Sequence, residues 1–244
     1  MRVLVTGHKG FIGRNVYLDW QEQLGSVNVD GIDFPDNIGQ FDGGDYDLVI
    51  HLAAYANIRE SLEDPEKFYV NNVLMAKPLF DWCRDTNTRL LYASSSAVEE
   101  EYWENPYAMT KWVNEMMAPS NSVGLRFTTV YGPDSREDMM YRMLEDKTAK
   151  YVTNHRRDWI HVKDVCRAIR YLAHANVNGP VSVGTGNSVS VKELAEKMGM
   201  GHLPLKEDTP GERFDNAADT TVLTSIGWFP TVNVMDTVKK NLVS

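Results

Sequence analysis

The sequence predicts an α/β fold with a doubly wound parallel sheet, and three observations lead to it. Short apolar runs of strand length alternate with segments of helical periodicity along most of the 244-residue chain, a pattern typical of parallel strands joined by helices. The first apolar run, at residues 2–6, leads into a turn with three glycines. The second run ends at an acidic residue, Asp33. Together these features indicate a sheet covered by helices on both faces.

The predicted elements follow one another in the order strand, turn, helix. Apolar residues recur at helical spacing from Asn15 to Gln23, directly after the glycine turn. Proline is favoured in the first turn of a helix, so Pro106 marks a later helix start. Predicted strands lie at 2–6, 27–32, 47–54, 89–96 and 123–130, and predicted helices lie at 15–23, around 70–74, from Pro106 and from about Val162.

The last third of the chain differs in character. "GPVSVGTG" predicts a strand and a turn, "SVSVKELAEKMG" an amphipathic helix behind a serine cap, and "DTTVLTSIGW" another short helix. We therefore predict two domains, residues 1–150 and a small lobe of residues 151–244, with the chain crossing back to the first domain at about 158–185. Open α/β sheets bind ligands at the carboxyl ends of their strands, where this lobe would lie.

Composition argues against several classes of protein. The net charge is −9 and no basic stripe runs along the chain, which disfavours a general binder of nucleic acid or of anionic membranes. The longest apolar runs are only as long as strands, so none is expected to cross a bilayer. Cys83 and Cys166 stand far apart, outside any metal-ligand spacing, and the chain opens on a strand rather than a leader. We expect a cytoplasmic protein with no metal site.

Gly7, Gly10 and Gly13 have the spacing of a dinucleotide-binding turn. The first glycine permits the tight turn, the second lets backbone approach a pyrophosphate, and the third lets the helix pack closely on the strand. The N–H groups at the start of the helix then face the phosphates. Glycines that merely end a strand are the alternative, but the strand, the helix and Asp33 are all placed as dinucleotide binding requires.

Asp33 indicates which dinucleotide is bound. It lies 20 residues beyond Gly13 (33 − 13 = 20), where a carboxylate accepts hydrogen bonds from a ribose diol. A carboxylate there repels a 2′-phosphate, so NAD is preferred to NADP. His8, Lys9 and Arg14 are cationic or can become so, and they keep NADP as a minority alternative.

"YAMTK" places Tyr107 and Lys111 four residues apart, on one face of the helix that begins at Pro106. A nearby ammonium favours the phenolate and lowers the pKa of a tyrosine from its free value of about 10. Such a tyrosine can pass a proton to or from a sugar or alcohol oxygen while a nicotinamide moves hydride. Any of the three serines of "YASSSAV" could hold that oxygen, although such pairs and serine runs also occur as surface neighbours and turns.

A series of motifs follows one order along nearly the whole chain: "TGHKGFIG", "DLVIHLAA", "SLEDPEKFYVNNV", "SSSAV", "YAMTK", "LRFTTVYGP", "RRDWIHVKDV", "VSVGTGNSVSVKELAE" and "GWFP". In these motifs the chain resembles the extended short-chain dehydrogenases/reductases, the nucleotide-sugar epimerase/dehydratase family. The resemblance implies a Rossmann-like fold, NAD as cofactor, a nucleotide-sugar substrate and no metal. It also implies a homodimer formed by the helices that carry residues 68–83 and 107–117.

Carried over residue by residue, the resemblance also implies individual roles. Tyr107 would be the acid/base, Lys111 would hold the nicotinamide ribose, and Ser95 would be the catalytic serine, with Ser96 a close second. The cofactor would be bound by Gly7, Gly10, Phe11, Ile12, Gly13, Asp33, Leu52, Ala53, Ala54, Tyr107 and Lys111. The substrate would be bound by Ser95, Ser96, Thr129, Arg157 and Arg213. Arg157 would grip the nucleotide diphosphate, and the alternative for Arg157 is an ion pair with Asp158 or Asp164.

The chain departs from the family pattern at several places. Between Asp33 and Asp47 there is no room for a strand–helix–strand crossover, which needs a dozen or more residues, so one edge of the sheet is expected to be shortened to a loop. Thr129 stands where an asparagine is typical, and Arg213, two residues past Gly211, would substitute for a second phosphate-binding arginine. The pocket for the sugar nucleotide is therefore expected to be reduced.

The residues after the catalytic serine bear on the reaction. Ser96 and Ala97 follow Ser95, where dehydratases and decarboxylases of the family would be expected to carry acidic residues for additional proton transfers. This argues against elimination. We predict an NAD-dependent nucleotide-sugar epimerase that acts at C4 through a 4-keto intermediate, with a UDP-sugar favoured. An NAD(P)H-dependent keto-sugar reductase and a non-catalytic dinucleotide-binding protein are the alternatives.

Overall fold

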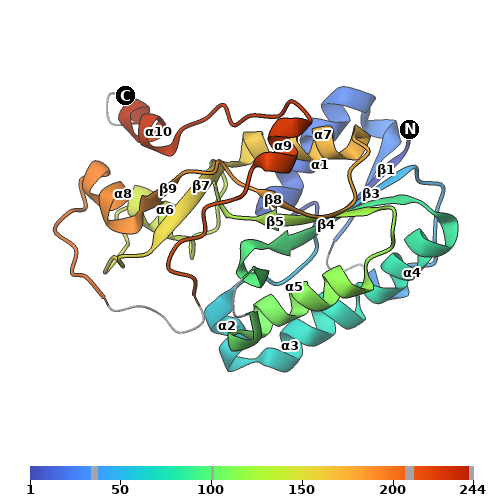
Figure 1. Ribbon diagram of the computed structural model, residues 1–244, viewed down its shortest axis with the longest axis horizontal. Coiled ribbons are helices and arrows are strands. Elements are labelled where there is room, and N and C mark those ends of the chain that lie inside the picture. The colour runs from blue at the N-terminus through green and yellow to red at the C-terminus, as the bar shows by residue number, and fades with distance from the viewer. Residues whose placement is uncertain (34–37, 100–101, 207–211, 242–244) are drawn as a thin grey trace. The chain divides into compact units, whose positions relative to one another are not determined.

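The computed structural model describes residues 1–33, 38–99, 102–206 and 212–241 (Figure 1). The chain forms two compact units. The first unit comprises residues 1–126 and 169–181, and the second comprises residues 127–168 and 182–244.

The first unit is built on a six-stranded sheet with the strand order β2-β1-β3-β4-β5-β8. Strands β2, β1, β3 and β4 pair in parallel, and Val3 lies opposite both Val29 and Leu48. This confirms the predicted α/β fold with a parallel, doubly wound sheet. The strand bounds are Val29–Ile32 for β2, Val3–Thr6 for β1, Leu48–His51 for β3, Arg89–Ser95 for β4, Ser122–Phe127 for β5 and Gly179–Val183 for β8.

Helices cover both faces of this sheet. In Figure 1, α1 lies on one face, and α3, α4 and α5 lie on the other. A π-helical turn, η3, continues α3, and the short α2 precedes it. The bounds are Phe11–Leu24 for α1, Ile58–Glu63 for α2, Pro65–Tyr69 for α3, Val70–Leu74 for η3, Lys77–Thr86 for α4 and Pro106–Met117 for α5. Short 3₁₀ turns lie at Ser26–Asn28 (η1), Ile38–Gln40 (η2), Ser96–Val98 (η4) and Tyr102–Glu104 (η5).

One edge of the sheet is shortened, as predicted. Between Asp33 and Asp47, the described residues form only the turn η2, so β2 is the edge strand. The thirteen residues from 34 to 46 are fewer than the roughly 30 that a further strand–helix–strand unit requires. Beneath this edge, residues of β1, β3, β4 and α4 form a buried apolar cluster of Leu4, Val49, Ala76, Leu79, Phe80, Cys83, Leu90 and Tyr92.

The return segment is tied to the first unit by Arg89, at the start of β4. Its guanidinium donates to the carbonyl oxygens of Leu172 at 3.0 Å and Val177 at 2.7 Å. Both carbonyls lie at or just beyond the end of α7, Val162–His174, which begins in the second unit and ends in the first. An ion pair between Arg170 and Asp19 joins α7 to α1.

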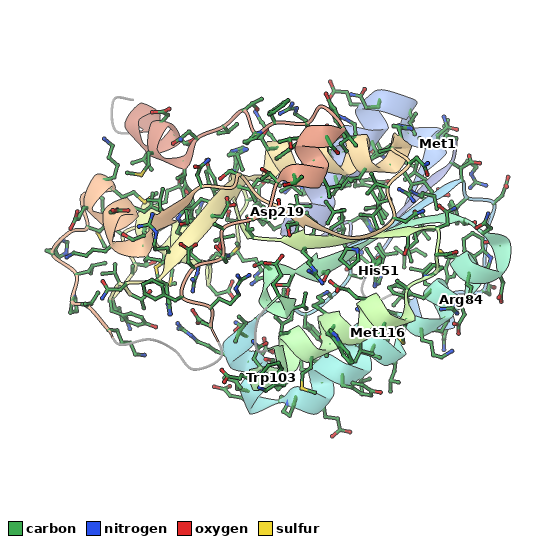
Figure 2. All side chains as sticks on the ribbon, in the orientation of Figure 1. Met1, His51, Arg84, Trp103, Met116 and Asp219 are labelled. Carbon is green, nitrogen blue, oxygen red and sulfur yellow. The ribbon has the colours of Figure 1, made fainter. Side chains whose placement is uncertain are left out.

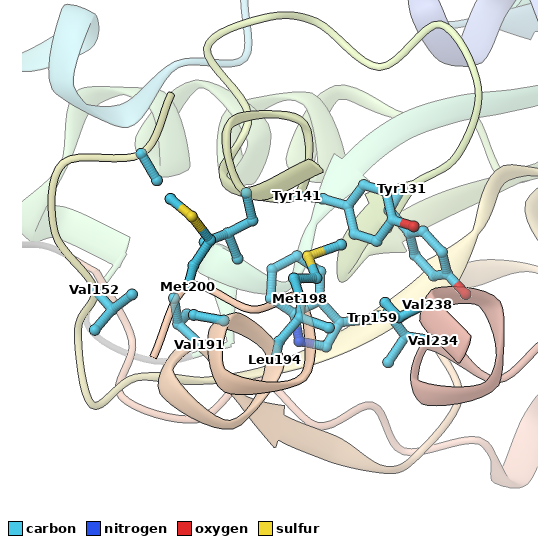
Figure 3. Close-up of a cluster of buried hydrophobic side chains, with 13 residues drawn as sticks. Tyr131, Tyr141, Val152, Trp159, Val191, Leu194, Met198, Met200, Val234 and Val238 are labelled. Atoms are coloured by element: carbon cyan, nitrogen blue, oxygen red, sulfur yellow. The ribbon is translucent and has the colours of Figure 1, made fainter. Parts of the chain in front are cut away.

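The second unit holds a three-stranded sheet with the order β6-β7-β9. Strands β6 and β7 pair in parallel, and β7 and β9 pair antiparallel. Its core is a cluster of aromatic, aliphatic and methionine side chains around Trp159, including Tyr131, Tyr141 and Leu194 (Figure 3). The bounds are Thr129–Tyr131 for β6, Arg156–His161 for β7, Ser188–Ser190 for β9, Met140–Glu145 for α6, Val191–Lys197 for α8, Thr221–Ser225 for α9 and Val234–Asn241 for α10.

Several elements differ from those predicted. The strand expected at 123–130 is two strands, β5 and β6, in different sheets, because the backbone N–H of Thr128 donates to the carbonyl oxygen of Val183 at the break. Strand β7 and helix α10 were not predicted. The serine cap of α8 is Ser190, which forms a capping box with Glu193, and strand β9 directly precedes it. The two compact units divide at residue 126 rather than at residue 150, and the segment that returns to the first unit is 169–181 rather than 158–185.

Candidate functional site

The glycine turn is packed too tightly for any larger residue. Gly7 has a φ of +73°, and a Cβ there would lie 2.7 Å from the backbone nitrogen of Ala53. A Cβ on Gly13 would lie 1.9 Å from the carbonyl oxygen of Gly7, whereas one on Gly10 would lie 3.3 Å from the same oxygen. The backbone of Gly10 itself donates to that oxygen at 3.0 Å. The first and third glycines are therefore required by close backbone approach, in the roles expected from their spacing.

The end of β3 closes against this turn. Leu52 donates its backbone N–H to the carbonyl oxygen of Thr6 at 3.1 Å, and Ala53 donates to the Thr6 Oγ1 at 3.3 Å. Thr6 Oγ1 also lies 2.8 Å from Nδ1 of His51, which Figure 2 labels at the end of β3. Burial, together with the charge of Lys111, lowers the pKa of His51 to about 3. His51 is thus a neutral, hydrogen-bonded core residue.

Tyr107 and Lys111 lie on successive turns at the start of α5. Asn105 caps the helix by accepting from the Ala108 N–H at 2.6 Å, and Ser61 Oγ accepts from the Tyr107 N–H at 3.2 Å. Two of the N–H groups that a helix leaves without intrahelical partners are therefore satisfied. Tyr107 is therefore held on a well-anchored first turn, and Lys111 follows on the next turn.

Lys111 is almost fully buried, with 2% of its surface exposed. Its ammonium donates to the carbonyl oxygen of Ala93 on β4 at 3.0 Å and lies 5.8 Å from the centroid of the Tyr107 ring. Burial lowers the pKa of Lys111 to about 7. The charge next to Tyr107 therefore titrates near neutral pH, because the protein offers the ammonium little solvation.

The three serines at the end of β4 have different surroundings. Ser94 Oγ donates to Oε1 of Glu115 on α5 at 2.5 Å. Ser95 Oγ accepts from the Ala97 N–H at 3.2 Å and caps the turn η4, in which Ser96 is the first residue. Ser95 is the last residue of β4 and stands at the carboxyl end of the strand. Only Ser94 is engaged by Glu115.

Arg157, at the start of β7 in the second unit, contacts residues of the segment 212–214. It donates to the carbonyl oxygen of Arg213 at 2.7 Å and to the carboxylate of Glu212 at 3.0 Å. In the described part of the chain its ion-pair partner is Glu212, and not Asp158 or Asp164. Arg157 and Arg213, both predicted to bind substrate, are thus brought side by side.

Thr129, the third predicted substrate residue of the second unit, lies at the start of β6. Its Oγ1 accepts from Nδ2 of Asn216 at 3.2 Å, and Oδ1 of Asn216 accepts from the Asp158 N–H at 2.7 Å. The Asp158 carboxylate in turn accepts N–H groups from Thr185 and Ala218. Burial raises the pKa of Asp158. This network fixes the segments that follow β8 and precede α9 against β7.

The described residues meet the requirements of neither a metal site nor a membrane-spanning helix. No group of three or more His, Cys, Asp or Glu side chains in them is arranged to hold a metal ion. Among the helices that the structure describes, none combines the length and the apolar character that a membrane span requires.

Comparison with known proteins identifies the family. The model of the NAD dependent epimerase/dehydratase family matches residues 3–184, about three quarters of the chain. This chain belongs to that family. The resemblance found in the sequence motifs and the expectation of NAD as cofactor are thereby confirmed.

One relative and two solved structures match this chain over nearly its whole length. A protein of Escherichia coli O111:H-, an uncharacterized 37.6 kDa protein in the cld 5′ region, is 30% identical, with 98% of this chain and 96% of that protein covered. MoeE5, solved with UDP-glucose and NAD, matches 100% of both chains at 24% identity and a TM-score of 0.84. The UDP-glucose 4-epimerase of Thermotoga maritima, solved with UDP-glucose, matches 100% of both chains at 21% identity and a TM-score of 0.84. At these identities, the likeness to the solved structures establishes a shared fold.

The glycine turn of this epimerase/dehydratase family member fits NAD. Gly10 is the N-cap of α1 and has no side chain with which to bond the first N–H groups of the helix, which begins at Phe11 and Ile12. Such a helix start binds a pyrophosphate. The Asp33 carboxylate accepts from the Lys9 N–H at 2.6 Å, so the acidic residue predicted to meet the ribose is held at the turn.

Three residues that support the site were not predicted from the sequence. Asn72 is buried on η3 and bonds the Tyr55 backbone and Thr110 Oγ1, which ties the loop after β3 to α5. Glu115 and Glu212 pair with Ser94 and Arg157 as described above. The double asparagine of "YVNNV" was a usable signal for Asn72. The sequence around either glutamate gives no sign of its role, because each contacts a partner that is distant in the sequence.

Proposed function

We propose that this member of the NAD-dependent epimerase/dehydratase family is a nucleotide-sugar epimerase that inverts C4 of a UDP-sugar. The observation that carries the proposal is the pairing of Tyr107 with the buried Lys111 beside the end of β4. The ammonium lies 5.8 Å from the phenol ring centroid and is anchored on the Ala93 carbonyl. A cation in this position favours the phenolate, as a proton-transfer tyrosine requires.

The proposed mechanism uses Tyr107 twice. NAD held by the glycine turn and Asp33 would supply reversible hydride transfer at C4 of the sugar. The Tyr107 phenolate takes the proton of the C4 hydroxyl, and the resulting phenol later gives a proton back to the same oxygen. The Lys111 ammonium stabilises the phenolate, and Ser95 holds the C4 oxygen by a hydrogen bond. The 4-keto sugar must turn over between the two proton transfers for C4 to be inverted.

The second unit supplies the proposed grip on the nucleotide diphosphate. Arg157 and Arg213 would bind its phosphates, and Thr129 would contribute a hydroxyl. A planar guanidinium suits phosphate because it can donate two parallel hydrogen bonds. Since Glu212 already pairs with Arg157 at 3.0 Å, the phosphates would have to compete with an internal carboxylate.

Epimerisation is favoured over elimination by the surroundings of the serines. Ser95 is followed by Ser96 and Ala97 in η4, and neither can act as a carboxylic acid. The next acidic residue, Glu99, pairs at 3.9 Å with Arg126, which also pairs with Glu115. Glu100 and Glu101 lie outside the described residues. The residues that follow Ser95 therefore support a reaction that needs only one proton-transfer group.

We also propose that the chain forms a homodimer. The two copies would associate through the face of α3, η3 and α5 that carries exposed apolar side chains. These are Tyr69, Leu74, Met109 and Met116, and Met116 is labelled in Figure 2. Unbranched methionines adapt well to a packed interface. We also retain the cytoplasm as the proposed location.

The proposed function is tested by releasing any bound nicotinamide nucleotide from the purified protein with denaturant and identifying it by mass. The same preparation is then assayed, without added cofactor, for interconversion of UDP-glucose with UDP-galactose and of UDP-glucuronate with UDP-galacturonate. We expect near-stoichiometric NAD and turnover of one pair. Consumption of added NADH or NADPH with a keto-sugar would replace the epimerase with a reductase. Absence of both cofactor and turnover would leave a binding protein.

A further inference from the structure

Helix α5 is joined to β4 by two contacts on neighbouring strand residues. The Lys111 ammonium donates to the Ala93 carbonyl oxygen at 3.0 Å, and Ser94 Oγ donates to Glu115 Oε1 at 2.5 Å. Lys111 and Glu115 are one helical turn apart. The two contacts therefore fix where the end of β4 lies along α5 and how the strand end is oriented toward the helix.

Glu115 is itself held firmly. Only 7% of its side chain is exposed, and Arg126 on β5 donates to both carboxylate oxygens, at 2.9 Å from Nε and 2.7 Å from Nη2. This two-point pairing gives the carboxylate one geometry. Charge compensation by Arg126 also allows the carboxylate to stay ionised in a nearly dry position. Ser94 is thus clamped to a rigid unit made of α5 and β5.

We propose that Glu115 is a positioning residue for the reaction, acting through Ser94 on the set Ser95, Tyr107 and Lys111. The inference rests on the proposed function and deepens it. Glu115 does not touch the reacting groups. It acts because Ser94 stands between the Ala93 carbonyl, which anchors the Lys111 ammonium, and Ser95, which is proposed to hold the sugar oxygen.

The consequence of losing the clamp follows from chain connectivity. If Ser94 is released, the peptide unit that carries the Ala93 carbonyl gains freedom, and the Lys111 ammonium moves with its acceptor. The distance from the ammonium to the Tyr107 phenol then increases on average, and the phenolate is stabilised less. The position of Ser95 relative to Tyr107 is then no longer fixed either.

Ser94→Ala is the variant of choice because it removes one hydroxyl and leaves the Glu115–Arg126 pair intact. The matched control is Ser122→Ala. Ser122 is a buried serine at the start of β5 and donates to the Pro119 carbonyl oxygen at 2.5 Å. Both changes delete one buried hydroxyl hydrogen bond, so a general loss of stability affects both proteins. Only Ser94→Ala cuts the link to α5.

Turnover is the first readout. We expect Ser94→Ala to lower kcat by about tenfold to a hundredfold with little change in KM, since small misplacements of reacting groups have effects of this size. Ser122→Ala should keep the kcat of the wild type.

The second readout needs no turnover. Tyrosinate absorbance is followed with pH in each protein and in the same protein carrying Tyr107→Phe, and the difference gives the midpoint at which Tyr107 ionises. We expect this midpoint to rise in Ser94→Ala and to stay unchanged in Ser122→Ala. A merely structural role for Glu115 would leave the midpoint where it is in the wild type.

The two readouts separate this inference from the proposed function. If the wild type converts no nucleotide sugar, the proposed function fails while the ionisation of Tyr107 still tests the positioning role. If the wild type turns over and Ser94→Ala matches Ser122→Ala in either kcat or the Tyr107 midpoint, the positioning role is overturned.

Discussion

At the scale of single residues, Lys111 links the site to the stability of the fold. Burial lowers the pKa of Lys111 from its ordinary 10.5 to about 7. Because the folded pKa lies below the unfolded one, the unfolded chain binds the additional proton between pH 7 and pH 10. The free energy of unfolding contributed by this residue therefore rises with pH across that window, by on the order of 5 kcal/mol in total. The His51 ring stays neutral throughout, since its pKa is about 3.

The variant Lys111→Met tests this link. It removes the titrating group and keeps an apolar chain of similar length, so we expect the cofactor-free variant to gain stability over the wild type at pH 7. The gain should shrink as pH rises towards 10. Urea unfolding of both proteins at pH 7, 8 and 9 measures it. Parallel stability profiles would show that Lys111 does not titrate in this window.

A second prediction at this scale concerns Glu212. If its carboxylate competes with phosphate for Arg157, Glu212→Gln should tighten the binding of UDP by about tenfold, in line with the loss of one charge-assisted pair. Isothermal titration calorimetry with UDP measures the change. Asp215→Asn is the matched control, since Asp215 lies in the same segment and pairs with Arg156 at 3.5 Å. Equal tightening in both variants would point to net charge, and weaker binding in Glu212→Gln would make Glu212 a ligand contact.

The sequence predicted individual residues best where the chemistry is local. The glycine turn, the start of α5 at Pro106 and the Tyr107–Lys111 spacing all depend on residues within one turn or one strand–helix junction. The choice among the three serines could not be made in this way. Ser94 is distinguished only by Glu115, 21 residues further along the chain, and Arg157 meets Glu212 across 55 residues.

At the scale of elements, the alternation of apolar runs and amphipathic segments was enough to predict the main sheet. Strand β7 was missed because its sequence, "RRDWIH", reads as polar although its last four residues are buried. Asp158 tolerates that burial because Thr185, Gly186 and Ala218 donate hydrogen bonds to it. The predicted strand 123–130 is divided for a similar reason, since the Val183 carbonyl binds the Thr128 N–H where β5 ends. Both the burial of β7 and the break after β5 thus depend on partners that are distant in the sequence.

Helix α5 is the element on which the account depends. Its N-terminal turns carry Tyr107 and Lys111, its third turn carries Glu115, and Met109 and Met116 are exposed on another part of its surface. One helix would thus set the acid/base pair, the link to β4 and the proposed contact between subunits. Changes at the exposed positions can therefore be separated from changes at the site.

At the scale of the whole molecule, the proposed dimer makes a direct prediction. Met116 has 68% of its surface exposed, so the substitution Met116→Glu, combined with Met109→Glu, should leave a folded monomer. Sedimentation velocity measures the change in mass. Val27→Glu is the matched control, because Val27 is 84% exposed on η1, outside the proposed interface. A wild type that sediments as a monomer, or a dimer that survives the double change, would contradict the proposed interface.

The division of the chain was the property least accessible to sequence. The predicted boundary at residue 150 followed a change in composition, whereas the compact units divide at residue 126 and interleave through 169–181. Interleaving arises when α7 leaves one unit and enters the other, and Arg89 then fixes the returning segment. Composition along a chain carries no signal for such a return.

The proposed inversion at C4 is tested most directly by the fate of a deuterium label at C4 of the UDP-sugar that the protein turns over. The substrate, UDP-glucose or UDP-glucuronate with deuterium at C4, is incubated in ordinary water and the C4-inverted product is analysed by mass. Hydride that leaves and returns at the same carbon does not exchange with solvent, so we predict full retention of deuterium in the product. Loss of the label to water, or no inversion of either sugar, would contradict the account.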